Sequence, residues 1–214
     1  MASVAVIDYG MGNLHSIGKA LQHVAPKNDI CITSDVDYID QADRVVFPGV
    51  GAIADCVLAL QRMELSEVVI RAAREKPFLG ICLGLHALLE QSDENDLTQC
   101  LGYFPGKVIH FDRDLVDGAG DPLKIPHMGW NSVEQSFSHP MWTGIPQSSR
   151  FYFVHSYYAK PTRADHIAAT ADYPTAFACA LATRNVFAVQ FHPEKSQTAG
   201  LQLLKNFITW DGSY

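Results

Sequence analysis

The sequence lacks a long apolar run and has few charged residues. No stretch approaches the ~20 apolar residues that a membrane-spanning helix needs. The first residues, M-A-S-V-A-V-I-D, carry neither the basic segment nor the cleavage site of a signal peptide. Charged residues make up 18% of the 214 positions, below the ~25% typical of soluble domains. We therefore expect a cytoplasmic protein with much buried or interface surface and no contact with a membrane.

Runs of basic residues and paired metal ligands are also missing. The 16 basic residues are outnumbered by 23 acidic ones, for a net charge of −7, which argues against a nucleic-acid partner. The five cysteines include no C-x-x-C pair, and the nine histidines show neither H-E-x-x-H nor H-x-H. These absences argue against a disulfide framework and against a metal site. No cofactor is predicted.

Two periodicities alternate in the first half of the chain. Short β-branched runs occur at residues 4–8, 30–33, 44–47 and 78–82. Segments with helical spacing lie between or after them, at residues 14–24, 52–63, 65–75 and 83–91. This alternation is typical of βαβ units. It predicts a three-layer α/β fold, flavodoxin-like or Rossmann-like, in which helices cover both faces of a mostly parallel sheet.

The second half changes character. Apolar runs follow one another through short turns at residues 107–112, 150–159, 167–172, 176–183 and 186–191. This pattern predicts an antiparallel β extension, and an amphipathic helix at 198–210 closes the chain. The polar stretch 92–99 is expected to form a surface loop. Because no composition shift marks a linker, residues 1–214 are expected to form one domain.

A cysteine lies at the most distinctive local pattern of the chain. Residues 76–89 read K-P-F-L-G-I-C-L-G-L-H-A-L-L, an apolar strand that runs through G-x-C-x-G into a helix. This is the pattern of a nucleophile elbow with Cys82 as the nucleophile. The helix N-terminus would favour a thiolate, and the N–H of Leu83 would face an oxyanion. A small buried cysteine after a strand is the alternative, but the flanking Gly80 and Gly84 favour the elbow.

A base and an orienting carboxylate follow near the end of the chain. The segment V-Q-F-H-P-E-K-S places His192 and Glu194 two positions apart. In an extended segment this spacing puts both side chains on one face, and Pro193 keeps the segment from coiling into a helix. An H-x-E pattern is common by itself, as a histidine at a strand end beside a solvated glutamate. Together with the elbow it indicates a Cys-His-Glu triad.

A glycine-rich loop offers a second oxyanion donor. Residues 47–52, F-P-G-V-G-A, end a predicted strand and open a helix. Gly49 and Gly51 would let the peptide unit at Val50 turn its N–H toward a ligand. Such a helix start could equally hold a phosphate. Neither G-x-x-x-x-G-K-[S/T] nor G-x-G-x-x-G supports that alternative.

These three motifs, in this order, resemble those of the class I, triad-type glutamine amidotransferases over essentially the whole chain. Three further segments are D-Y-G-M-G-N-L-H-S at 8–16, P-H-M-G-W-N at 126–131 and F-Y-F-V-H-S-Y at 151–157. They narrow the resemblance to the glutaminase subunits of imidazole glycerol phosphate synthase. The resemblance implies hydrolysis of L-glutamine to glutamate and ammonia. It also implies a heterodimer with a (βα)8-barrel cyclase, which uses the channelled ammonia to make imidazole glycerol phosphate and AICAR in histidine biosynthesis.

The resemblance also assigns roles to individual positions. Cys82 would be the nucleophile, His192 the acid/base and Glu194 the residue that orients it. Glu94 would contact the ammonium group of the substrate, and Ser156 and Tyr157 would also contact the substrate. Four positions would meet the cyclase: Asn13, Trp130, Tyr152 and Lys195.

One position departs from the family pattern. Four residues after the nucleophile, where the family has a glutamine that holds the substrate carboxylate, this chain has His86. An imidazole can also donate to a carboxylate, so we expect retained activity with an altered KM. Two alternatives stay open: an amidotransferase subunit for another synthase, such as one that makes surface sugars, and a regulatory or scaffolding subunit that has lost turnover.

Overall fold

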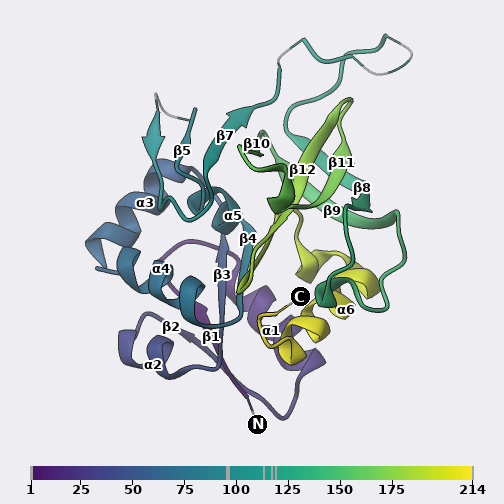
Figure 1. Cartoon of the computed structure of the whole chain (residues 1–214). Coiled ribbons are helices and arrows are strands. Elements are labelled where there is room, and N and C mark those ends of the chain that lie inside the picture. The colour runs from purple at the N-terminus through teal and green to yellow at the C-terminus, as the bar shows by residue number, and fades with distance from the viewer. Residues whose placement is uncertain (1, 95–96, 113, 117, 119, 214) are drawn as a thin grey trace.

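The computed structural model describes residues 2–94, 97–112, 114–116, 118 and 120–213, and it confirms the predicted mixed sheet (Figure 1). Five strands form its parallel part in the order β2-β1-β3-β4-β13. They are β1 (Ser3–Ile7), β2 (Asp29–Thr33), β3 (Arg44–Gly49), β4 (Phe78–Cys82) and β13 (Val186–Val189). β4 and its neighbour β3 are buried in the middle of this part, so the elbow lies at the centre of the sheet edge.

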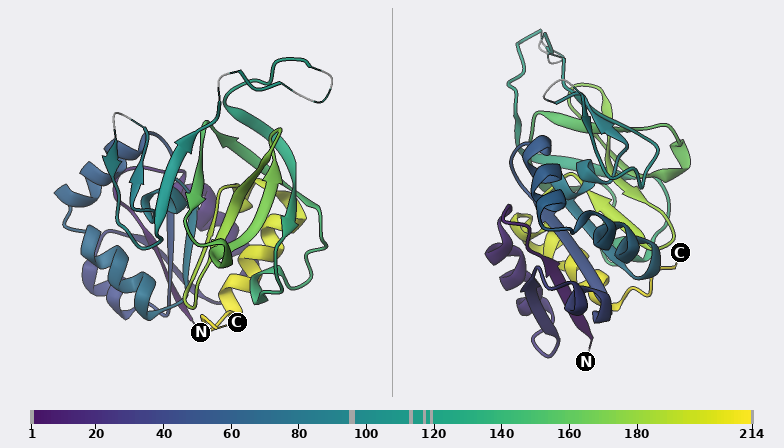
Figure 2. Two further views of the ribbon diagram at one scale, coloured as in Figure 1. Left: turned by 45° about the horizontal axis from the view of Figure 1, so that its top comes forward. Right: turned by 90° about the vertical axis from the view of Figure 1, so that its left-hand side faces the viewer.

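Helices cover both faces of the parallel strands, as Figure 2 shows. One face carries α1 (Leu14–Val24) and α6 (Gln197–Thr209). The other carries α2 (Val36–Gln41), α3 (Ile53–Arg62), α4 (Ser66–Glu75) and α5 (Leu83–Ala87). Alternate side chains of β1 divide between the two cores, with Val4 and Val6 on the α1 side and Ala5 and Ile7 on the other. This period of two is what a strand buried on both faces requires.

The antiparallel extension joins the parallel strands at β13. β12 (Ala176–Ala182) pairs with β13 in antiparallel register, with Leu181 opposite Ala188. Beyond it the sheet continues through β10 (Tyr157–Pro161), β7 (Gly106–His110), β5 (Gln91–Ser92) and β6 (Thr98–Gln99). A branch leaves β12 through β11 (Ile167–Asp172), β8 (His127–Gln135) and β9 (Ser149–His155). Three short 3-10 helices, η1 (Pro140–Trp142), η2 (Ala164–His166) and η3 (Pro193–Lys195), complete the fold.

The helix expected at 83–91 ends at Ala87, so its predicted length is wrong. The carbonyl groups that a longer helix would use are taken by a later loop. The N–H groups of Leu101 and Phe104 donate to Ala87 and Leu88 at 2.9 and 2.8 Å. The chain therefore leaves the helix early and returns as β5, and β5 and β6 pair as a short hairpin in the stretch 92–99 that was expected to be a loop. Residues 95 and 96 of that stretch lie outside the described residues.

The strand expected at 150–159 is two strands that pair with different neighbours. β9 pairs with β8, whereas β10 pairs with β7, and Ser156 forms the bend between them. Also not predicted were α2, β8 and the three 3-10 helices. Asp35 begins α2 by accepting hydrogen bonds from the N–H groups of Asp37 and Tyr38. No helix in the described ranges is both long and apolar enough to span a membrane.

Candidate active site

The turn from β4 into α5 has the geometry of a nucleophile elbow. Cys82 has φ +53°, a conformation that a non-glycine residue rarely adopts and that is typical of strained functional turns. A Cβ at Gly84 would overlap the carbonyl oxygen of Phe47, and one at Gly80 would lie 3.1 Å from the Cβ of Ala188. Position 84 therefore needs glycine, and Gly80 lies where a larger residue would be crowded, as the sequence predicts.

His192 and Glu194 form a buried pair after β13. Nδ1 of His192 donates to Oε1 of Glu194 at 2.9 Å, and the side chains are 2% and 4% exposed. The backbone N–H of His192 donates to the carbonyl of Tyr152 at 2.9 Å. Burial disfavours the charged ring, but the Cys82 side chain and the Glu194 carboxylate outweigh it and raise the pKa of His192 to about 10. These two neighbours therefore favour the protonated ring.

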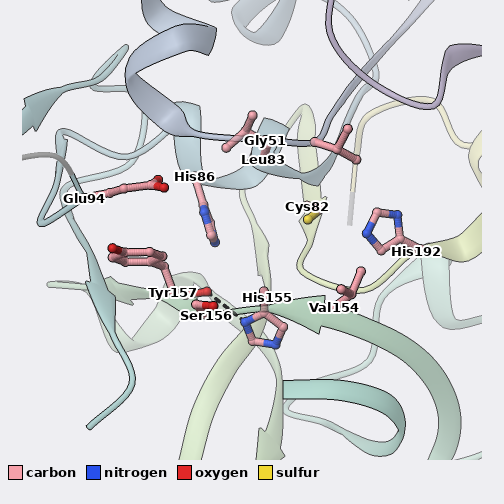
Figure 3. Close-up of a pocket in the computed structure, with 11 residues that line it drawn as sticks. Gly51, Cys82, Leu83, His86, Glu94, Val154, His155, Ser156, Tyr157 and His192 are labelled. Atoms are coloured by element: carbon pink, nitrogen blue, oxygen red, sulfur yellow. Dashed lines mark hydrogen bonds between the residues drawn. The ribbon is translucent and has the colours of Figure 1, made fainter. Parts of the chain in front are cut away.

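Cys82 and His192 face each other across the sheet edge, as Figure 3 shows. Nδ1 of His192 is hydrogen-bonded to Glu194, so Nε2 is the ring nitrogen that faces the Cys82 sulfur. Within the described residues this buried Nε2 makes no hydrogen bond. A buried N–H with no other partner is free to transfer a proton between the thiol and a leaving group.

Two segments bring possible oxyanion donors to the sulfur. Leu83 is the first residue of α5, so its N–H has no acceptor within the helix. The register of β3 against β4 sets Gly49 opposite Cys82, which carries the following Val50 and Gly51 to the same edge. Gly51 has φ +105° and Val50 is 39% exposed. The loop at 49–51 is thus positioned beside the nucleophile.

A cavity of about 280 Å³ opens in front of Cys82. Figure 3 shows the cysteine between the rings of His86 and His192, with β9 and its following turn as the opposite wall. The lining residues are Val50, Gly51, Cys82, Leu83, His86, Glu94, Val154, His155, Ser156, Tyr157 and His192. Two predicted site residues are not part of this lining. Gly49 and Glu194 line a smaller cavity together with Asn13 and His192.

The predicted substrate residues form the far end of the cavity. Glu94 accepts a hydrogen bond from the N–H of Ile53 at 3.1 Å, at the N-terminus of α3. The carbonyl of Ser156 accepts from the N–H of Phe111 at 3.0 Å. The ring of Tyr157 packs edge-on against His110, with 4.7 Å between the ring centroids. These contacts fix the backbone of the bend between β9 and β10, so its polar groups are held in place along the cavity.

The fold adds Gln190 to the site, which sequence reasoning missed. Its Oε1 lies 2.7 Å from Nε2 of His86, and its Nε2 donates to Sγ of Cys82 at 3.9 Å. Gln190 is fully buried and His86 is 5% exposed. The only sequence signal for Gln190 is its place two residues before His192. His86 lines the cavity as predicted, but it also makes this hydrogen bond at its back.

A second unpredicted feature is a pair of buried histidines beside the cavity. Nδ1 of His127 lies 3.0 Å from Nε2 of His155, and Nδ1 of His155 lies 2.8 Å from the carbonyl oxygen of Tyr157. Because that carbonyl only accepts, His155 must carry its proton on Nδ1 and accept from His127. Burial lowers the pKa of His127 to about 4, so the pair is neutral. No cluster of three or more possible metal ligands occurs in the part of the chain that the structure describes.

The residues expected at the cyclase interface form two groups. Trp130 packs edge-on against Tyr152, with 6.1 Å between their ring centroids, and Nζ of Lys195 lies 5.9 Å from the centroid of the Tyr152 ring. Trp130 is 36% exposed, so this group reaches the surface. Asn13 lies apart from the three, at the N-terminus of α1 beside the smaller cavity.

Comparisons with known proteins agree with this geometry. A model of the family "Glutamine amidotransferase class-I" matches residues 5–210. Imidazole glycerol phosphate synthase subunit HisH of Methylococcus capsulatus is 63% identical over 99% of this chain and 98% of its own length. Its counterpart in Nitrosococcus oceani is 59% identical over 99% of each chain.

Solved structures support the fold. A crystal structure of a glutamine amidotransferase superimposes with a TM-score of 0.70 at 15% identity and covers 96% of this chain and 97% of its own. PurLQS from Thermotoga maritima has a TM-score of 0.69 at 15% identity, with 98% and 99% covered. At this identity the likeness concerns the fold alone. From the family match and the close relatives together, the chain belongs to the class-I glutamine amidotransferases and, within them, to the family of the HisH subunit of imidazole glycerol phosphate synthase.

Proposed function

We propose that the chain is the glutaminase subunit of an imidazole glycerol phosphate synthase and hydrolyses L-glutamine with Cys82, His192 and Glu194. One observation carries the proposal. Two segments distant in sequence bring the Cys82 sulfur with the neighbouring Leu83 N–H and the His192 ring to one cavity. A strained cysteine, an imidazolium and an unpaired helix N–H at one point are the parts that acyl transfer needs.

The reaction starts from a thiolate–imidazolium pair. The Cys82 thiolate attacks the carbon of the side-chain amide of glutamine, and a C–S bond forms as the carbonyl becomes an oxyanion. The N–H of Leu83 and the N–H of Val50 stabilise this oxyanion. His192 gives its proton to the amide nitrogen, the C–N bond breaks and ammonia leaves. The neutral His192 then takes a proton from water, which attacks the thioester and releases glutamate and the thiolate.

The far end of the cavity would hold the amino-acid part of glutamine. Glu94 carries the carboxylate for the substrate ammonium, and it is held at the start of α3 by the Ile53 N–H. Ser156 and Tyr157 offer backbone groups on the opposite wall. This arrangement suits a ligand with an ammonium group at one end and an amide group at the other.

The product ammonia needs a route that excludes bulk water, because water would protonate it. We propose a (βα)8-barrel cyclase as the partner in a heterodimer, seated on the face that carries Trp130, Tyr152 and Lys195. The exposed Met128 and Trp130 lie on one side of β8 and give that face apolar area.

We also propose that residues 1–214 act as one domain and that the chain works in the cytoplasm, in keeping with its five free cysteines.

The test compares two nitrogen sources in the complex with the cyclase. Cys82→Ala should abolish synthesis from glutamine and leave synthesis from added ammonium salts intact, because only the glutaminase step needs the thiol. Cys31→Ala, a half-buried cysteine on β2, serves as the matched control and should leave both rates unchanged. Glutamine hydrolysis by purified Cys82→Ala protein would refute the assignment of the nucleophile.

A further inference from the structure

His86 and Gln190 form a buried polar pair directly behind the nucleophile. His86 lies on α5, one turn after Cys82, and Gln190 lies between β13 and His192. The two side chains meet at 2.7 Å between Nε2 of His86 and Oε1 of Gln190. The other end of the Gln190 amide donates to the Cys82 sulfur at 3.9 Å. The three side chains are therefore linked in a line that ends on the reacting atom.

The direction of these hydrogen bonds follows from the chemistry of the groups. The carbonyl oxygen of an amide only accepts, so the proton between His86 and Gln190 belongs to Nε2 of His86. Burial lowers the pKa of His86 to about 4, so at neutral pH the ring carries a single N–H. Among the described residues, Nε2 is the one ring atom of His86 with a hydrogen-bond partner. The bare Nδ1 can accept a hydrogen bond but cannot donate one.

The orientation of the Gln190 amide and the proton of His86 depend on each other. In the structure the amide oxygen faces Nε2 of His86 and the NH2 group faces the sulfur. If the amide turned over, the proton of His86 would have to move to Nδ1, so that Nε2 could accept from the NH2 group. The amide oxygen would then point its negative end at the sulfur, which disfavours a thiolate. The observed orientation, with an N–H toward the sulfur, is therefore the one that stabilises negative charge on Cys82.

We propose that His86 is a positioning residue that holds the Gln190 amide so that it donates to the Cys82 sulfur, and that His86 does not hold the substrate carboxylate. This inference rests on the proposed function, since it assumes that Cys82 is the nucleophile. A hydrogen bond to an ionised partner is stronger than one to a neutral partner. The Gln190 N–H is thus positioned to stabilise negative charge on the sulfur. The carboxylate must find its donors elsewhere in the cavity, because the N–H of His86 is already used.

Two readouts separate this role from substrate binding. Alkylation of Cys82 in the full chain by iodoacetamide, a reagent without a carboxylate, reports the thiolate alone. Glutamine hydrolysis in the complex with the cyclase gives kcat and KM separately. The variants are Gln190→Met, which removes the N–H donor at similar volume, and His86→Leu, which frees the amide to turn. His86→Gln keeps an N–H donor at the same position.

We expect Gln190→Met and His86→Leu to slow alkylation and to lower kcat by about tenfold or more, the effect of losing a hydrogen bond to a charged group. KM for glutamine should stay within about twofold. His86→Gln should recover most of the alkylation rate. A rise of tenfold or more in KM for His86→Leu, with the alkylation rate unchanged, would show that His86 holds the carboxylate and overturn the proposal. An unchanged alkylation rate in Gln190→Met would overturn it as well.

The parent protein supplies a measurement that does not depend on any variant folding. Long-range 1H–15N spectra of the 15N-histidine-labelled chain should show His86 as the neutral Nε2–H tautomer at pH 7. A proton on Nδ1, or a charged ring, would contradict the proposal. Failure of the proposed function looks different, because the parent protein itself would then show neither alkylation at Cys82 nor glutamine hydrolysis with the cyclase.

Discussion

Nδ1 of His192 donates to Oε1 of Glu194 at 2.9 Å inside the protein, where 2% and 4% of the two side chains are exposed. The two residues therefore have unequal roles. His192 transfers protons, whereas Glu194 orients the ring and stabilises its charge. In the complex with the cyclase, His192→Ala should lower kcat for glutamine hydrolysis by at least about 10²–10⁴-fold, the usual contribution of a general acid/base. Glu194→Gln should lower kcat by less.

The carboxylate of Glu194 also affects the pH dependence. It is one of the groups that raise the pKa of His192 to about 10, so its removal should lower that pKa. The alkaline limb of the kcat profile should consequently move to lower pH in Glu194→Gln. A larger loss of kcat in Glu194→Gln than in His192→Ala would mean that the roles are reversed.

Because of the loop at 49–51, we expect the chain to hydrolyse glutamine slowly without its partner. Val50 is 39% exposed and has glycines on both sides, so its peptide unit can turn. With the Val50 N–H directed away from the site, the oxyanion would have one donor, and such a loss costs roughly 10²–10³-fold in rate. Glutamine hydrolysis should therefore increase by about that factor from the chain alone to the complex with the nucleotide ligand of the cyclase. Equal rates for the chain alone, for the complex and for the liganded complex would rule out this switch.

Two glycines with very different surroundings give a stability test. A Cβ at Gly84 would overlap the Phe47 carbonyl oxygen, whereas one at Gly118 would have nothing within 4 Å. Gly84→Ala should lower the free energy of unfolding by roughly 3 kcal/mol, the cost of overpacking a rigid backbone contact. Gly118→Ala should change it by less than about 0.5 kcal/mol. Urea unfolding of both variants measures this, and equal midpoints would mean that the elbow can relax around an added methyl group.

Three buried histidines should make the protein sensitive to acid. Burial lowers the pKa of His86, His127 and His139 to about 4 in each case, below the ordinary value of about 6.5. Between these values the unfolded chain binds more protons than the folded one, so the free energy of unfolding falls as the pH drops from about 6.5 toward 4. Each histidine should contribute roughly 1–3 kcal/mol to this loss. Urea unfolding at pH 7 and at pH 4.5 checks it, and a flat profile would mean that other groups compensate.

Much of the local structure could be predicted from the sequence because it depends on neighbouring residues. The β-branched run of β1 and the helical spacing of α1 are local patterns, and both elements match their predicted ranges closely. The tight turn at Cys82 likewise shows in G-x-C-x-G, because only glycine tolerates the close approach of Phe47. The end of α5 could not be predicted, since the carbonyl groups there are taken by the N–H groups of Leu101 and Phe104.

The sequence by itself determined the nucleophile candidate, the candidate base and the order in which they occur, since each lies in a motif whose local geometry its own neighbours impose. The tertiary structure alone decided what these residues touch. The pairing of β13 with β4 brings Gln190 beside Cys82 and His86, and the bend at Ser156 places His155 on the cavity wall. Contacts between residues about a hundred positions apart depend on strand order and register. These arise from burial of the whole sheet, and no local spacing encodes them.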